Sequence, residues 1–150
     1  MVAAVAKLMS NMDLVTVAAK LPVTAHCNTT IGKKGVFAGR LQPNHARDDL
    51  DGIMASVYEG ISYGVGDAVI GLNPVADSVD TTIRILGKFR DFLDEYQIPS
   101  QNCVLSHVTT QMEALKKGAR IDLMFQSLAG TELANRGFGI SVEMMDEAYE

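Results

Sequence analysis

The chain has 150 residues, of which 47% are hydrophobic and 21% charged, a composition that favours one folded domain and excludes a disordered chain. The net charge of −5 argues against a general nucleic-acid binder and against a binder of anionic membranes. We expect neither a membrane-spanning helix nor a signal peptide, because no apolar run is long enough and no cationic region precedes the first one.

The first part of the chain predicts a helix followed by a strand–helix unit. Residues Ala3–Ala19 are rich in Ala, Leu, Met and Val and predict one helix, which Pro22 ends. Gly35–Gln42 predicts a strand that ends at Pro43–Asn44. Asp48–Tyr63 predicts a helix, because its apolar residues recur at helical spacing and acidic residues occupy its first turn.

The rest of the chain continues the alternation of strand and helix. The strands are short apolar runs, and the helices carry apolar stripes and end near Pro or Gly. In chain order we predict strand Asp67–Leu72, helix Val79–Tyr96, strand Cys103–Val108, helix Thr110–Lys117, strand Ile121–Ser127 and helix Ile140–Glu150.

Apolar strands that alternate with helices indicate a parallel sheet with right-handed crossovers. We expect strands near residues 36–42, 69–72, 104–107 and 123–126 to be parallel and adjacent in that order. An open doubly wound sheet and a (β/α)8 barrel share this pattern, and composition does not separate them. Each strand ends in polar residues, which in a barrel would meet at one mouth.

Arg40 is the most informative candidate for a site. It lies at the end of an apolar strand, where a buried guanidinium group requires a carboxylate or an anionic ligand. None of the predicted strand ends carries a carboxylate, so the partner is Asp48, Asp49, a ligand or protein outside this chain. The alternative is an arginine that caps the barrel rim.

Three carboxamides offer both a donor and an acceptor to a small polar substrate: Gln42, Asn73 and Gln126. Asn73 precedes Pro74 and is equally typical of a turn opening. The histidines and the cysteines Cys27 and Cys103 have no metal-binding spacing, so we predict no metal site and two buried free thiols.

Five longer segments resemble one known family, the large subunit of ethanolamine ammonia-lyase. The resemblance extends over nearly the whole chain, and strings of this length in the same order are far more specific than any short motif. The segments are NTTIG (Asn28–Gly32), RLQPN (Arg40–Asn44), YEGISYGVGDAVIGLNPV (Tyr58–Val75), CVLSHVTTQ (Cys103–Gln111) and FQSLAGTE (Phe125–Glu132).

This resemblance implies an α/β fold, namely the first half (about four β/α units) of a TIM (β/α)8 barrel with an N-terminal helix. Residues 1–150 would form a single partial domain, truncated at both ends relative to the family. The family converts ethanolamine to acetaldehyde and ammonia by radical chemistry of adenosylcobalamin bound over the barrel mouth. It also implies a small-subunit partner, a homo-oligomer of large subunits, and a cytoplasmic enzyme found inside bacterial microcompartments.

The resemblance also assigns individual residues. The family's substrate-contacting Arg, Gln and Asn fall on Arg40, Gln42 and Asn73. Residues near the cofactor fall on Pro74, Gln126 and Ser127. Lys33–Lys34 and Gly39 depart from the expected residue types around the first strand.

The family's catalytic Glu and Asp belong to later strands and have no counterpart in this chain. We therefore expect the chain to have no complete catalytic set and to be inactive alone. A different hypothesis is a non-catalytic half-barrel that binds ligands or assembles through its exposed edges. A complete small α/β enzyme of another family is disfavoured, because no full acid–base or nucleophile set is present.

Overall fold

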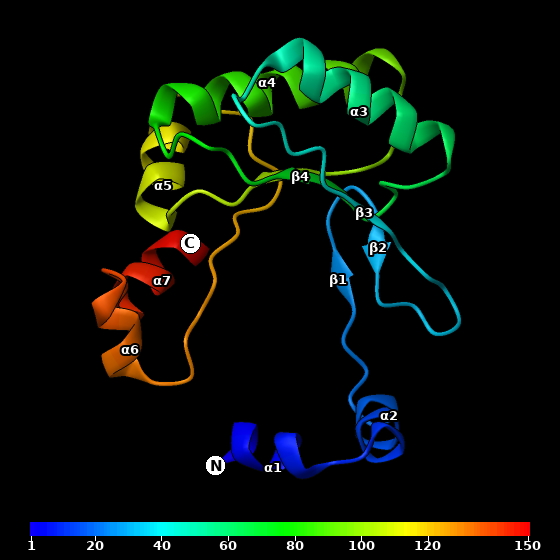
Figure 1. The fold of residues 1–150 in the computed structure, drawn as a ribbon, viewed down its shortest axis with the longest axis vertical. Coiled ribbons are helices and arrows are strands. Elements are labelled where there is room, and N and C mark those ends of the chain that lie inside the picture. Colours follow the sequence, from blue (N-terminus) through cyan, green and yellow to red (C-terminus); the bar gives the residue numbers. More distant parts are fainter.

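The computed structural model describes all 150 residues. A parallel sheet lies at its centre, and helices α3 (Leu50–Ser62) and α4 (Val79–Glu95) lie side by side over one face of it (Figure 1). The sheet contains β3 (Arg40–Leu41), β4 (Val69–Leu72) and β5 (Asn102–Val104) in that order. The structure therefore confirms three predicted strands as parallel neighbours in chain order.

The main core lies between this sheet and its helices. Alternate residues of the strands, Ile70, Leu72 and Val104, face helices α3 and α4 and are fully buried. From α4, Phe89 packs into the same cluster with 0% exposure. Complete burial of one large apolar side chain contributes about 1.5–3 kcal/mol, so this cluster holds the helices on the sheet.

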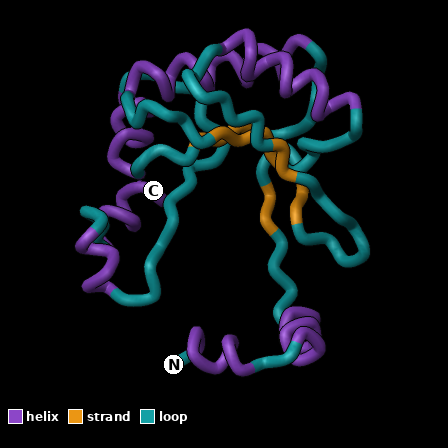
Figure 2. The backbone as a smooth tube through the Cα atoms, viewed as in Figure 1, coloured by secondary structure: helices purple, strands orange, loops and turns teal.

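The other residues of the strands face away from the helices. Val69 and Cys103 form a separate small cluster with Ala68. No helix lies against this second face, which is open in the ribbon and in the backbone trace (Figures 1 and 2). We call it the open face of the sheet.

The predicted fourth strand, Ile121–Ser127, does not form, and this prediction was wrong. The segment runs beside β5, but the backbone joins it to that strand through one hydrogen bond, from Leu123 N to Asn102 O (3.1 Å). Further along, the buried Gln111 side chain bonds both backbone groups of Phe125. A side-chain carboxamide thus takes the place of a strand ladder.

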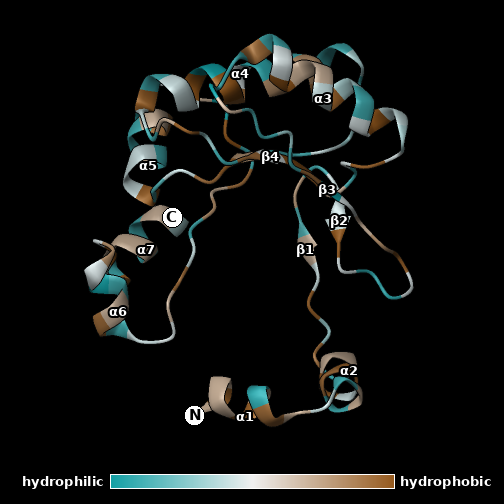
Figure 3. Cartoon of the chain, viewed as in Figure 1, coloured by the Kyte–Doolittle hydropathy of each residue, from teal (hydrophilic) through white to brown (hydrophobic).

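The N-terminal region also differs from its prediction. The expected single helix is two helices, α1 (Val2–Leu8) and α2 (Asn11–Ala19). Ser10 separates them, because its hydroxyl accepts from Asp13 N while the Asp13 carboxylate accepts from Ser10 N, which begins a new helix. Both helices are apolar, have no buried residue and lie away from the sheet (Figures 1 and 3).

A short antiparallel hairpin follows, which the sequence did not predict. Its strands are β1 (Ala25–His26) and β2 (Thr30–Ile31). Of the strand predicted over Gly35–Gln42, Arg40 and Leu41 alone pair with β4. Cys27 lies in the hairpin and is exposed, so the prediction of two buried thiols holds for Cys103 alone.

Three helices complete the chain. The helix α5 (Val108–Lys116) follows β5, and α7 (Val142–Tyr149) contacts it. The unpredicted helix α6 (Glu132–Gly137) begins at Thr131, whose hydroxyl accepts from Ala134 N. No helix is long and apolar enough to span a membrane.

Candidate functional site

Arg40 lies within β3 and extends its guanidinium group over the open face of the sheet. The group passes directly above Gly71 of β4, where a Cβ atom would lie 2.8 Å from Arg40 Nη2 and would also collide with Cys103 Sγ. Glycine at position 71 leaves room for the guanidinium group, because a side chain there would displace it. On its other side, Arg40 Cζ lies 5.6 Å from the ring centroid of Phe125, a cation–π contact.

The guanidinium group of Arg40 has no carboxylate partner. Its Nε and Nη2 atoms are buried and make no hydrogen bond. Neither expected carboxylate is available: Asp48 accepts from Val75 N and Ala76 N, and Asp49 accepts from Gly52 N. Burying N–H donors of a charged group without an acceptor is costly, and Arg40 is the one residue of the chain whose buried side-chain atoms lack a partner.

The thiol of Cys103 does not neutralise Arg40. Burial raises the pKa of Cys103, although the nearby Arg40 guanidinium opposes the shift. The thiol is consequently neutral at neutral pH. Because the pKa of Cys103 is raised by folding, the buried neutral thiol contributes fully to stability below the pKa that Cys103 has in the unfolded chain. This contribution is lost as the pH rises through the pKa of Cys103 in the folded chain.

The two cysteines should differ sharply in reactivity. We expect iodoacetamide at neutral pH to modify the exposed Cys27 rapidly and Cys103 only after unfolding, because the thiolate is the reacting form and Cys103 is 2% exposed. Peptide mass spectrometry over a labelling time course measures both rates, with labelling in urea as the control. Equal rates in the folded chain would contradict the burial of Cys103.

A hollow of about 360 Å³ opens at the carboxyl ends of β4, β5 and the segment that follows them. It gathers Asn73, Gln126 and Ser127, three of the six residues predicted for the site. The full set of lining residues is Asn73, Asp77, Leu105, Ser106, His107, Phe125, Gln126 and Ser127. Arg40 does not line this hollow. Phe125 does, and the guanidinium group of Arg40 lies over the Phe125 ring.

Gln42 and Pro74, which were also predicted for the site, do not line the hollow. Gln42 directly follows β3 and is exposed, and Pro74 is half-buried beside Asn73. The carboxamide of Asn73 is exposed and bonds no other group of the chain, so its donor and acceptor are free. By contrast, Gln126 uses both ends of its amide, accepting from Val108 N (2.8 Å) and donating to Ser127 O (3.0 Å).

The hollow contains one carboxylate that the sequence analysis missed. Asp77 lies in the loop between β4 and α4, four residues beyond Asn73, and its Oδ2 accepts from His107 N (3.3 Å). The loop after a strand reaches the same edge of the sheet as the strand end, so Asp77 joins residues that were predicted from the strand ends. Both ring nitrogens of His107 already make hydrogen bonds, Nδ1 with Thr109 Oγ1 (2.7 Å) and Nε2 with Phe138 O (2.9 Å).

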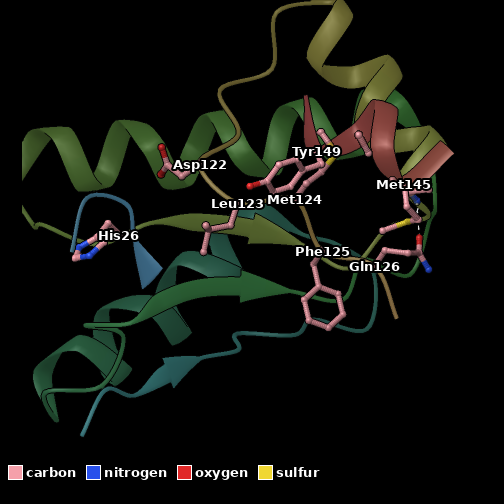
Figure 4. Close-up of a pocket in the computed structure, with 10 residues that line it drawn as sticks. His26, Asp122, Leu123, Met124, Phe125, Gln126, Met145 and Tyr149 are labelled. Atoms are coloured by element: carbon pink, nitrogen blue, oxygen red, sulfur yellow. Dashed lines mark hydrogen bonds between the residues drawn. The ribbon is translucent and has the colours of Figure 1, made fainter. Parts of the chain in front are cut away.

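A second pocket, of about 600 Å³, lies between the 122–126 segment and α7 (Figure 4). Most of its walls are apolar, including Leu123, Met124 and Met145. The carboxylate of Asp122 is engaged by Arg90 Nη1 (3.0 Å) and Asn102 N (2.9 Å), so it stabilises the fold. Across the chain, no group of three or more His, Cys, Asp or Glu side chains is placed to hold a metal ion.

These features define an α/β protein with a polar hollow at the carboxyl ends of parallel strands, where α/β proteins commonly bind ligands. The chain belongs to the family described as the ethanolamine ammonia-lyase large subunit (EutB), a lyase family whose model matches residues 1–150. It is 53% identical over 147 residues to the ethanolamine ammonia-lyase large subunit of Escherichia coli (strain K12), covering 98% of this chain and 32% of that protein. The corresponding subunit of Salmonella typhimurium (strain LT2) is 52% identical with the same coverage.

The comparisons confirm the resemblance described from the motifs. The chain spans about a third of the length of these curated relatives.

Proposed function

We propose that this chain forms part of the substrate- and cofactor-facing wall of an adenosylcobalamin-dependent ethanolamine ammonia-lyase. In this proposal the parallel strands β3, β4 and β5 belong to the first half of a (β/α)8 barrel, and the open face of the sheet is the barrel interior. Their order, with helices on one face alone, supports this assignment. The ethanolamine ammonia-lyase large subunits that this chain matches are about three times as long.

The buried guanidinium group of Arg40 is the observation that carries the proposal. Its Nε and Nη2 atoms are buried without a partner next to Gly71, and the ring of Phe125, which Arg40 contacts, lines the hollow that contains Asn73. The hydroxyl oxygen of ethanolamine accepts hydrogen bonds and fits these donors, whereas its ammonium group is repelled by Arg40. We therefore orient the hydroxyl end toward Arg40 and the ammonium end toward the amide oxygens of Gln42 and Asn73.

The cofactor is assigned to the mouth of the hollow on the chemistry of its donors. Ser127 is exposed and its hydroxyl bonds no other group of the chain, and Pro74 offers an apolar edge. Both residues suit the rim of a binding site for a large cofactor that carries amide side chains. Because both ends of the Gln126 amide are engaged, its role would be to hold Ser127 through the Ser127 carbonyl.

When bound, adenosylcobalamin supplies the carbon-centred radical that removes hydrogen from the substrate carbon bearing the hydroxyl group. This chain's residues bind and orient the substrate for that step. They do not supply the carboxylates that the family uses at the ammonium group, so we propose that catalysis needs the strands beyond residue 150. The small subunit, the homo-oligomer of large subunits and a location inside a bacterial microcompartment belong to the same proposal.

A chimeric subunit tests the proposal. We expect residues 1–150, substituted for the matching third of the Escherichia coli large subunit, to give an enzyme that releases acetaldehyde from ethanolamine with adenosylcobalamin and the small subunit. The unmodified Escherichia coli enzyme is the control, and gel filtration checks assembly. A chimera that assembles and binds the cofactor yet shows no turnover would favour the non-catalytic binding module instead.

A further inference from the structure

The loops that follow β3 and β4 are joined by three hydrogen bonds between side chains and backbone. Asn44 Oδ1 accepts from Asn73 N at 2.9 Å. Asp48 accepts from two successive amides, with Oδ1 to Val75 N and Oδ2 to Ala76 N, both at 2.9 Å. All three acceptors lie in the first loop and all three donors in the second.

Asn44 connects two of the proposed substrate-binding residues directly. Its own N–H group donates to Gln42 O at 2.9 Å, while its side chain accepts from Asn73 N. Because the carboxamide of Asn73 bonds no other group of the chain, the hydrogen bonds that hold this residue in place are those of its backbone and of the loop around it. Asn44 therefore sets the distance between the Gln42 and Asn73 backbones.

Asp48 holds the same loop from a backbone conformation that side chains rarely adopt. Its φ of 52° lies in the left-handed region, which is unfavourable for a residue with a Cβ atom. This conformation aims both carboxylate oxygens at the loop after β4. A glycine would suit the backbone better but would provide no acceptor.

We propose that Asn44 and Asp48 are positioning residues that fix Asn73 opposite Arg40 and Gln42 for substrate binding. This inference rests on the proposed function, because it assigns these loops to the ethanolamine site. Neither residue touches the substrate. Both act through the backbone of residues 73–76, whose placement determines the geometry of the reacting complex.

The neighbouring Asp49 provides a matched control. Its carboxylate also accepts from a backbone amide, Gly52 N at 2.9 Å, but it caps α3 and makes no bond to the loop after β4. Replacing it removes a helix cap without releasing Asn73. Comparing variants of Asp48 and Asp49 therefore distinguishes a general loss of stability from a loss of the position of Asn73.

The experiment uses a full-length large subunit that carries these 150 residues, assembled with the small subunit and adenosylcobalamin. We expect Asn44→Ala and Asp48→Gly to lower kcat/KM for ethanolamine by about 10- to 100-fold. Hydrogen exchange should accelerate at the Asn73 amide in Asn44→Ala and at the Val75 and Ala76 amides in Asp48→Gly, since these amides lose their acceptors. Asn44→Asp keeps an acceptor and should restore most of both properties, and Asp49→Ala should leave kcat/KM near its original value.

Faster exchange at residues 73–76 with unchanged kcat/KM would overturn the inference, as would an equal loss of kcat/KM in Asp49→Ala. If Asp48→Gly does not fold, the Asn44→Ala and Asn44→Asp pair decides alone. Arg40→Ala separates this inference from the function on which it rests. If Arg40→Ala lowers kcat/KM and Asn44→Ala does not, the positioning role is wrong but the proposed function stands. If neither variant lowers kcat/KM, the proposed function itself is wrong.

Discussion

In the complete enzyme, we expect Arg40→Ala to lower kcat/KM for ethanolamine by about 10²- to 10³-fold, the usual effect of removing a preorganised donor from a reacting group. The free energy of unfolding should change little. The Nε and Nη2 atoms of Arg40 have no partner, so the substitution leaves no carboxylate unpaired and removes an uncompensated buried charge. The lost contact with Phe125 offsets part of that gain.

Two further arginine variants make this prediction specific. Arg40→Lys keeps the charge but not the planar set of donors, and should recover only a small part of the activity. Arg90→Ala is the structural control, because Arg90 bonds Asp94 and Asp122 at 2.9 and 3.0 Å. It should lower stability, since Asp122 would lose its partner.

Steady-state kinetics and urea unfolding of the three variants measure both quantities. If Arg40→Ala keeps normal turnover and instead loses stability, Arg40 is a structural residue of the barrel rim. Its assignment to the substrate would then be wrong.

The isolated 150-residue chain should release no acetaldehyde, even with adenosylcobalamin and the small subunit. Ethanolamine is an ammonium ion at neutral pH, and its proposed site also contains the unpaired cation Arg40. Asp77 is the carboxylate that lines the hollow, and its Oδ2 already accepts from His107 N. One partly engaged carboxylate does not balance both cations, so binding of the substrate should be weak.

The isolated chain should also self-associate. Its β3 edge is unpaired, and the apolar helices α1 and α2 expose residues such as Leu8, Met12 and Val15. Light scattering of the purified chain measures this, and acetaldehyde release measures turnover. Sustained turnover by a monomeric chain would show that the carboxylates of later strands are unnecessary.

Local patterns in the sequence were sufficient for the central elements of the fold. The helices α3 and α4 lie within one or two residues of the predicted Asp48–Tyr63 and Val79–Tyr96, because an apolar stripe and a capping residue define each of them. The parallel order of β3, β4 and β5 also followed, since apolar strands separated by helical crossovers have few other arrangements. Five motif segments in the right order were enough to identify the family.

The same reasoning failed where hydrogen bonds from polar side chains determine the backbone conformation. Ile121–Ser127 has the composition of a strand, yet Gln111 bonds the Phe125 backbone and no ladder forms there. The predicted helix over Ala3–Ala19 is divided by the capping box of Ser10 and Asp13. In each case a polar side chain offers the backbone a competing partner, which apolar periodicity does not register.

The site shows the same division. From the sequence alone, Arg40 was expected to need a partner, because a charged group at the end of an apolar strand is costly to bury. Only the tertiary structure decided that Asp48 and Asp49 are not that partner, since both carboxylates bond backbone amides instead. Likewise, Asn44 and Asn73 are 29 residues apart, and only folding places one beside the other. Contacts between loops depend on how the strands align, and that alignment is a property of the packed sheet.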